Sequence, residues 1–237
     1  GTEIAAGAQV HGPTRVGRGN RLHPHACLGA EPQDLKFAGE VVRLEIGDRN
    51  QFREFVTVYR GTGKGGGLTR IGSDNLFMVY AHVAHDCRVG DRTVFANNAT
   101  LAGHCEVHDD VILGAFSALQ QFGRIGRHAF IGGYSRLLSD ALPFVKTVGL
   151  RPIVLRVNRI GLQRKGFCAE RVSALTSAFR IFLRSWLNTS GAIERLATEF
   201  PGNADVDYLI EYVRAARRGV IRALPGRRGE DGGAESA

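Results

Sequence analysis

From Ile71 to Leu137, an aliphatic or aromatic residue returns at every sixth position of the sequence. A helix repeats its buried face every 3.6 residues and a strand every 2, so neither element explains this period. A strict six-residue period instead indicates a β-solenoid, in which short strands and turns wind around a narrow core. The register consists of Ile71, Phe77, Val83, Val89, Phe95, Leu101, Val107, Leu113, Leu119, Ile125, Ile131 and Leu137.

A smaller residue follows most of these anchors after four positions. These smaller residues are Ala81, Cys87, Thr93, Ala99, Cys105, Ser117, Ala129 and Ser135. We expect both kinds of residue to share the interior, the large one filling it and the small one leaving room. Cys87 and Cys105 are separated by three hexads, so they would stack in neighbouring coils if each coil holds three hexads. We predict two buried thiols there rather than a disulfide, and the absence of a CxxC pair argues against a zinc ribbon.

The register starts early and is interrupted twice. Its first members are Ile4, Val10, Val16, Leu22 and Leu28. The solenoid is therefore expected to begin at or before residue 1. One insertion follows Leu28 and ends before Ile46, and a second, GTGKGGGLTR, covers residues 61–70. Insertions in solenoids form loops on one face, which is often the binding face. Because the second insertion lacks the GxxxxGK[ST] spacing of a phosphate loop, we predict a mobile surface loop there.

Beyond Leu137 the apolar period becomes that of helices. The longest stripe consists of Val172, Leu175, Phe179, Phe182, Leu183 and Trp186. Shorter patterns at 193–200 and 206–213 predict two more helices. We therefore predict a β-helix domain at 1–150, a small C-terminal α-helical domain at 151–224 and a disordered tail at 225–237.

Composition limits the class of protein and its partners. No apolar run reaches the roughly 20 residues of a membrane span, and no charged-then-apolar leader opens the sequence. We therefore expect a cytoplasmic protein without membrane insertion. The formal charge of +8 comes largely from arginine-rich C-terminal segments. An acidic protein partner or a diphosphate explains this charge as well as nucleic acid does, and no nucleic-acid-binding motif accompanies it.

The strings AHVAHDC and LAGHC hold the candidates for chemistry. With three hexads per coil, one column contains His85, Gly103 and Gln121, and the next contains Asp86, His104 and Phe122. Stacked strands lie about 4.8 Å apart, so His85 and His104 can face a common site. His85 is a candidate general base because imidazole titrates near neutral pH. His82 and His85 could instead bracket a cation, and surface histidines that only stack along a coil corner are a further alternative; we expect no metal.

Several strings resemble the UDP-N-acetylglucosamine O-acyltransferase family, which begins lipid A synthesis. They are EPQDLKFAGE, LEIGDRN, GGGLTRIGSDNLFM, AHVAHDC, ANNATLAGH and RKGF, in the family's order, from about Ile4 to Arg222. The resemblance implies a left-handed parallel β-helix of hexapeptide repeats, and a homotrimer with sites between subunits. It implies transfer of a 3-hydroxyacyl chain from acyl carrier protein to the 3-hydroxyl of UDP-N-acetylglucosamine, with no cofactor.

The resemblance also assigns roles to single residues. His85 matches the family's general base, and Gly103 matches the backbone whose N–H holds the thioester oxyanion. Gly133 matches the ruler of acyl length. The positions that match substrate-binding residues are Asp34, Lys36, His82, Asp86, His104, Gln120, Gln121, Asn158, Arg164 and Lys165. Arg164 and Lys165 would pair with the diphosphate.

A wider basic cluster is expected where the solenoid meets the helices. Its members are Arg156, Arg159, Arg164, Lys165 and Arg171. We predict that this cluster receives acidic acyl carrier protein as well as the diphosphate.

Three positions depart from the family pattern. Gln120 and Tyr59 each stand where the family has a histidine, and Ile160 stands where an acidic residue is common. None is the implied base, and glutamine keeps one hydrogen bond of a neutral histidine. Two alternatives therefore stay open. One is a related enzyme that acylates another nucleotide amino sugar, such as a 3-amino sugar, and the other is a non-catalytic binding protein of the same fold.

Overall fold

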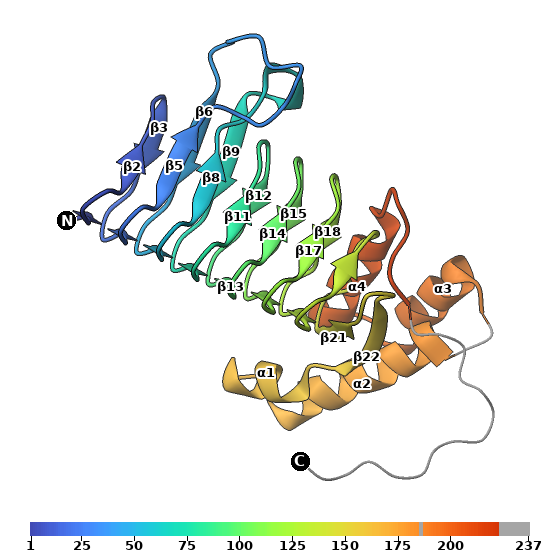
Figure 1. The fold of residues 1–237 in the computed structure, drawn as a ribbon. Helices are drawn as coiled ribbons and strands as arrows, with labels where there is room; N and C mark the ends of the chain where they lie inside the picture. Colours follow the sequence, from blue (N-terminus) through green and yellow to red (C-terminus); the bar gives the residue numbers. More distant parts are fainter. Residues whose placement is uncertain (185–186, 223–237) are drawn as a thin grey trace.

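The chain forms a parallel β-helix with helices at its C-terminal end (Figure 1). The computed structural model describes residues 1–184 and 187–222. Successive coils pair in parallel, with partners such as Leu76 with Val94 and Phe77 with Phe95, which are three hexads apart in the sequence. Each coil therefore holds three hexads, the condition under which the sequence places Cys87 and Cys105 in neighbouring coils.

The coils build three sheets that run along the solenoid. Sheet A contains β1 (Glu3–Ile4), β4 (Arg21–Leu22), β7 (Gln51–Phe52), β10 (Leu76–Phe77), β13 (Val94–Phe95), β16 (Ile112–Leu113), β19 (Phe130–Ile131), β21 (Val145–Val148) and β22 (Ile153–Val157). Sheet B contains β2 (Gln9–Val10), β5 (Cys27–Ala30), β8 (Thr57–Tyr59), β11 (His82–Val83), β14 (Thr100–Leu101), β17 (Ala118–Leu119) and β20 (Arg136–Leu137). Sheet C contains β3 (Thr14–Val16), β6 (Arg43–Ile46), β9 (Leu68–Ile71), β12 (Arg88–Val89), β15 (Glu106–Val107) and β18 (Arg124–Ile125).

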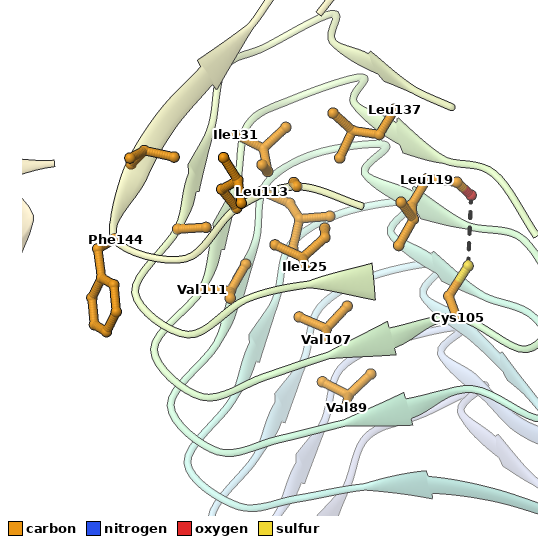
Figure 2. Close-up of a cluster of buried hydrophobic side chains, with 14 of the residues drawn as sticks. Val89, Cys105, Val107, Val111, Leu113, Leu119, Ile125, Ile131, Leu137 and Phe144 are labelled. Atoms are coloured by element: carbon orange, nitrogen blue, oxygen red, sulfur yellow. Dashed lines mark hydrogen bonds between the residues drawn. The ribbon is translucent and has the colours of Figure 1, made fainter. Parts of the chain in front are cut away.

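The hexad anchors fill the interior of the prism that the three sheets enclose. Phe77 and Phe95 are fully buried, and their rings lie 4.7 Å apart in successive coils. The small residues between the anchors are buried too, and Figure 2 shows the Cys105 thiol directed at the Leu119 carbonyl, 3.7 Å away. All four cysteines are free, which confirms the prediction of buried thiols at Cys87 and Cys105, and burial raises the pKa of Cys87.

The first coil has the predicted register without the predicted burial. Ile4 and Val10 lie in β1 and β2 as expected, yet their side chains are 60% and 42% exposed. No coil stacks on their outer side among the described residues, whereas Leu22 and Leu28 in the next coil are buried. Burial in a solenoid therefore depends on a neighbouring coil as well as on the sequence period.

Each coil turns at three edges through residues with positive φ. The A–B edge carries His25, Phe55, Tyr80, Asn98, Phe116 and Tyr134; the B–C edge carries Asp86, His104 and Phe122; the C–A edge carries Arg49, Asp74, Arg92, Asp110, His128 and Phe144. The left-handed conformation costs a non-glycine residue about 1–2 kcal/mol. Contacts between successive rungs offset part of this cost, as in the bidentate pair of Arg49 with Asp74 at 2.7 Å. Side chains far apart in sequence thus stack in columns along each edge.

The helices cover the last coil. They are α1 (Arg159–Arg164), α2 (Ala169–Arg184), α3 (Thr189–Glu199) and α4 (Ala204–Arg214), and a 3-10 helix, η1, spans Gly63–Gly65. The predicted boundary at residue 150 falls between β21 and β22, which pair antiparallel in sheet A, so the helices begin later, at Arg159. Trp186 and the predicted tail at 225–237 lie outside the described residues. None of the described helices has the length and apolar character that a membrane span requires.

Candidate active site

His85 and Asp86 form a buried pair on the B–C edge, in the turn between β11 and β12. The distance from His85 Nδ1 to Asp86 Oδ2 is 2.8 Å, and the two side chains are only 8% and 1% exposed. A carboxylate only accepts hydrogen bonds, so Nδ1 carries the proton and the Nε2 lone pair remains free. The structure thus shows that the His85 ring is held by the neighbouring Asp86, a contact that the sequence did not predict.

The second insertion holds the Asp86 carboxylate. The Thr62 N–H donates to Oδ1 at 2.9 Å, and the Thr62 hydroxyl donates to Oδ2 at 2.7 Å. A Cβ on Gly65 would lie 2.1 Å from the Asp86 carboxyl carbon, so only glycine lets the loop come this close. The prediction of a mobile surface loop at 61–70 is wrong here, because Thr62 is 3% exposed and bonded to the candidate site. No motif in the sequence signals this contact.

Gly103 lies directly beside the His85 ring. A Cβ at this position would be 2.6 Å from His85 Cε1, so any larger residue would displace the imidazole. Within the described part of the chain, the Gly103 N–H has no hydrogen-bond partner. A free backbone donor beside a candidate base is what an oxyanion site requires.

His104 completes the cluster from the next coil. Its ring meets the His85 ring edge-on, with centroids 5.1 Å apart, and stacks on Phe122 at 4.6 Å. Its Nε2 lies 3.7 Å from Asp86 Oδ2. Burial lowers the pKa of His104, although the Asp86 charge acts in the opposite direction. His104 is therefore neutral near pH 7 and can accept or donate a hydrogen bond.

The same cluster provides the atoms that a cation would need. One donor atom each from His85, Asp86 and His104 lies within 4.8 Å of the others. Both Asp86 oxygens already accept hydrogen bonds from Thr62, and Oδ2 also accepts one from His85. The arrangement fits an oriented imidazole better than a metal centre. His82 does not join this cluster, since its Nδ1 lies 2.8 Å from Thr57 Oγ1 on sheet B.

The first insertion reaches the same edge. Its Glu40 accepts the N–H of Gly63 in the second insertion at 2.9 Å, and Asp34 Oδ1 accepts the Lys36 N–H at 2.9 Å. The Asp34 charge also acts to raise the pKa of His104. Tyr59, one of the departures from the family pattern, lies 5.5 Å from His82 between ring centroids. Burial lowers the pKa of His82 and raises that of Tyr59, so both rings are uncharged near neutral pH.

The remaining sequence-predicted residues divide among the three edges. Gln120 and Gln121 follow β17 and are exposed at the B–C edge, near His104. Gly133 lies at the A–B edge beside Tyr134, which is 65% exposed. The structure therefore brings Gln120 and Gln121 to the His85 cluster but places the predicted acyl ruler on another edge.

The predicted nucleotide-binding residues lie at the C–A edge. Asn158 is buried and its Nδ2 donates to the His128 carbonyl at 3.2 Å. Lys165 Nζ forms an ion pair with Asp110 at 2.7 Å. Since His85 belongs to the B–C edge, one chain does not bring the predicted base and the predicted diphosphate cations to the same edge.

Only part of the wider basic cluster is free to bind a partner or a diphosphate. Arg171 donates to both Asp205 oxygens, at 2.9 and 3.0 Å, and its guanidinium lies 3.7 Å from the Phe167 ring centroid. Arg171 thus joins α2 to α4, and its predicted role in receiving a partner is not supported. Arg156, Arg159 and Arg164 remain exposed.

Two family models and a curated relative match this chain. A family model described as UDP-N-acetylglucosamine O-acyltransferase domain 2 matches residues 140–221, and one of bacterial transferase hexapeptide repeats matches residues 68–103. A Stenotrophomonas maltophilia protein named acyl-[acyl-carrier-protein]–UDP-N-acetylglucosamine O-acyltransferase is 49% identical over 209 residues, which is 87% of this chain and 79% of the relative.

Solved structures show the same similarity. A UDP-N-acetylglucosamine acyltransferase from Bacteroides fragilis matches with a TM-score of 0.90 and 37% identity, over 93% of this chain and 86% of that one. The Arabidopsis enzyme of the same description matches with a TM-score of 0.85 and 30% identity, over 94% and 88% of the two chains.

Proposed function

This chain belongs to the acyl-[acyl-carrier-protein]–UDP-N-acetylglucosamine O-acyltransferase family, and we propose that His85 is the general base of its acyl transfer. The reaction moves a 3-hydroxyacyl group from acyl carrier protein to the 3-hydroxyl of UDP-N-acetylglucosamine, the first step of lipid A synthesis. The observation that supports His85 most is its buried 2.8 Å hydrogen bond to Asp86, next to the free Gly103 N–H.

In the proposed mechanism, His85 Nε2 removes the proton of the sugar 3-hydroxyl while that oxygen attacks the thioester carbon. Asp86 stabilises the imidazolium that forms, and the Gly103 N–H donates to the oxyanion of the tetrahedral intermediate. Collapse of the intermediate breaks the carbon–sulfur bond. The leaving thiolate then takes the proton from His85, which restores the base.

None of the three altered residues forms a hydrogen bond with His85 or Asp86 in the described part of the chain. Gln120 is exposed, Ile160 is 57% exposed, and Tyr59 packs against His82 rather than His85. The intact His85–Asp86 pair favours turnover over a non-catalytic binding protein. Because Tyr59 and His82 lie on sheet B next to the cluster, an acceptor with a different 3-substituent is the alternative within the family.

We further propose a homotrimer of left-handed β-helices with sites between subunits. The placement of His85 and Lys165 on different edges supports this, because a neighbouring copy can bring its C–A edge to this chain's B–C edge. Gly133 would set acyl length at the A–B edge, beside Tyr134. We propose that the reaction takes place in the cytoplasm, since we expect its carrier-protein donor and nucleotide-sugar acceptor there.

The proposal is tested by product analysis. We expect mass spectrometry to detect acylated UDP-N-acetylglucosamine after incubation with 3-hydroxyacyl carrier protein, using a series of acyl lengths. A parallel reaction contains a UDP 3-amino sugar as the acceptor. If only the amino sugar is acylated, the acceptor assignment is wrong, and if neither is acylated at any acyl length, the proposed activity is refuted.

A further inference from the structure

A cavity of about 510 Å³ adjoins His104 on the side away from His85. Its lining consists of His104, Glu106, Phe122, Arg124, Asp140, Ala215, Arg217 and Arg218. One wall is the B–C edge with the neighbouring strands of sheet C. The other wall is the segment that follows α4, drawn in red beside β18 in Figure 1.

Hydrogen bonds fix this segment to the end of the B–C edge. The Ile221 N–H donates to the Asp140 carbonyl at 2.8 Å, and the Asp140 N–H donates to the Gly219 carbonyl at 3.2 Å. Arg218 Nη1 donates to the Gln121 carbonyl at 2.8 Å. The cavity is therefore a built part of the candidate site, formed by residues 97 positions apart in sequence.

The charge of this cavity is positive. Arg124 is neutralised by Asp140, with 2.8 Å between Nε and Oδ2. Arg217 and Arg218 have no ion-pair partner in the described part of the chain, and Glu106 is the remaining acid in the lining. Two guanidinium groups thus face one carboxylate, which favours an anion with several acceptor oxygens.

We propose that Arg217 and Arg218 bind the phosphodiester of the donor's phosphopantetheine arm, an inference that rests on the proposed function. The thioester must lie at His85, and the arm's linker separates it from the phosphate. Arg218 is likewise separated from His85, because the rings of His104 and Phe122 lie between them. These rings offer an aromatic surface on which the linker can lie. The acceptor's diphosphate fits this cavity less well than the donor's phosphate does, because it is attached directly to the sugar. The side chains proposed to bind it, Arg164 and Lys165, lie at the C–A edge.

The test compares donors with and without the phosphate. In the Arg217→Gln, Arg218→Gln variant, we expect the KM for a 3-hydroxyacyl-phosphopantetheine thioester to rise about tenfold or more, with kcat and the KM for UDP-N-acetylglucosamine unchanged. The KM for the corresponding pantetheine thioester, which lacks the phosphate, should be the same in variant and wild type. Arg214→Gln, an exposed change at the end of α4 outside the cavity lining, is the matched control.

Two results would overturn the proposal: an equal rise in KM for both thioesters, or a rise in the KM for the sugar nucleotide instead. Calorimetry of the two thioesters with wild type and variant gives the same comparison without turnover. If the wild type binds the phosphate-containing thioester more tightly and the variant does not, phosphate binding in the cavity is supported even if no acylated sugar forms. A wild type that makes no product but binds the two thioesters differently would refute the acyl transfer alone.

A separate observation concerns Thr62, and from it we infer that Thr62 is a positioning residue for His85. Its N–H and hydroxyl occupy one acceptor site on each Asp86 oxygen, and all these groups are buried. Glu40 of the first insertion accepts the N–H of Gly63 at 2.9 Å, which fixes the loop from the other side. That bond and one from Ala38 lower the pKa of Glu40, so its carboxylate is ionised at neutral pH.

Replacing the Thr62 hydroxyl tests whether Thr62 positions His85 for catalysis or only supports the fold. In Thr62→Val, which keeps the shape and the N–H, we expect kcat to fall about tenfold with both KM values unchanged. Thr62→Ser, which keeps both donors, should restore kcat. An unchanged kcat in Thr62→Val, or an equal loss in Thr62→Ser, would refute the positioning role. If the valine variant does not fold, Thr62→Ala removes the same hydroxyl and is expected to show the same fall in kcat; an unchanged kcat there would refute the role.

Discussion

His85→Ala is expected to lose about 10²- to 10⁴-fold in kcat while its affinity for both substrates stays close to that of the wild type. The reason is that Nε2 is the only atom of the pair placed to accept a proton, since Nδ1 is committed to Asp86 at 2.8 Å. Alanine at this position removes the base without crowding Gly103. Steady-state kinetics with saturating donor and acceptor measure the effect.

Asp86→Asn is the matched variant for the same experiment. An asparagine amide can donate to Nδ1, which would move the imidazole proton to Nε2 and remove the acceptor that the reaction needs. We expect kcat to fall in this variant although the His85 ring stays in place. Equal product from wild type and His85→Ala would exclude His85 as the base, whatever Asp86→Asn shows.

Mixed trimers provide the second prediction. His85→Ala and an Arg164→Ala, Lys165→Ala variant are each expected to be inactive, but subunits mixed in denaturant and refolded together should regain activity. With equal mixing, about a quarter of the sites receive both an intact His85 and an intact Arg164–Lys165 pair. The physical basis is that His85 lies on the B–C edge, whereas Lys165 is tied to Asp110 on the C–A edge.

The control mixture contains His85→Ala and His104→Ala subunits. Both changes lie on the B–C edge of one chain, with ring centroids 5.1 Å apart, so no mixed site contains both intact histidines. This mixture should show no recovery above the activities of its separate components. Absence of recovery in the test mixture, when wild-type subunits regain activity after the same treatment, would refute sites shared between subunits.

The six-residue period predicted the β-helix and the columns of residues at the candidate site. Because each coil holds three hexads, the columns of His85 with Gly103 and of Asp86 with His104 followed from arithmetic, and the structure confirms them. The period did not predict the exposure of Ile4, which depends on whether another coil covers it. It also did not predict that Arg171, although half-exposed, is held by Asp205.

The sequence by itself determined which residues face inward and which stack on each edge, because a regular period repeats the same local geometry in every coil. Only the tertiary structure decided what surrounds His85. Thr62 meets Asp86 across 24 positions, and Arg218 meets Gln121 across 97. Both contacts come from segments outside the repeat, whose paths are set by packing and hydrogen bonds with distant residues rather than by any local pattern.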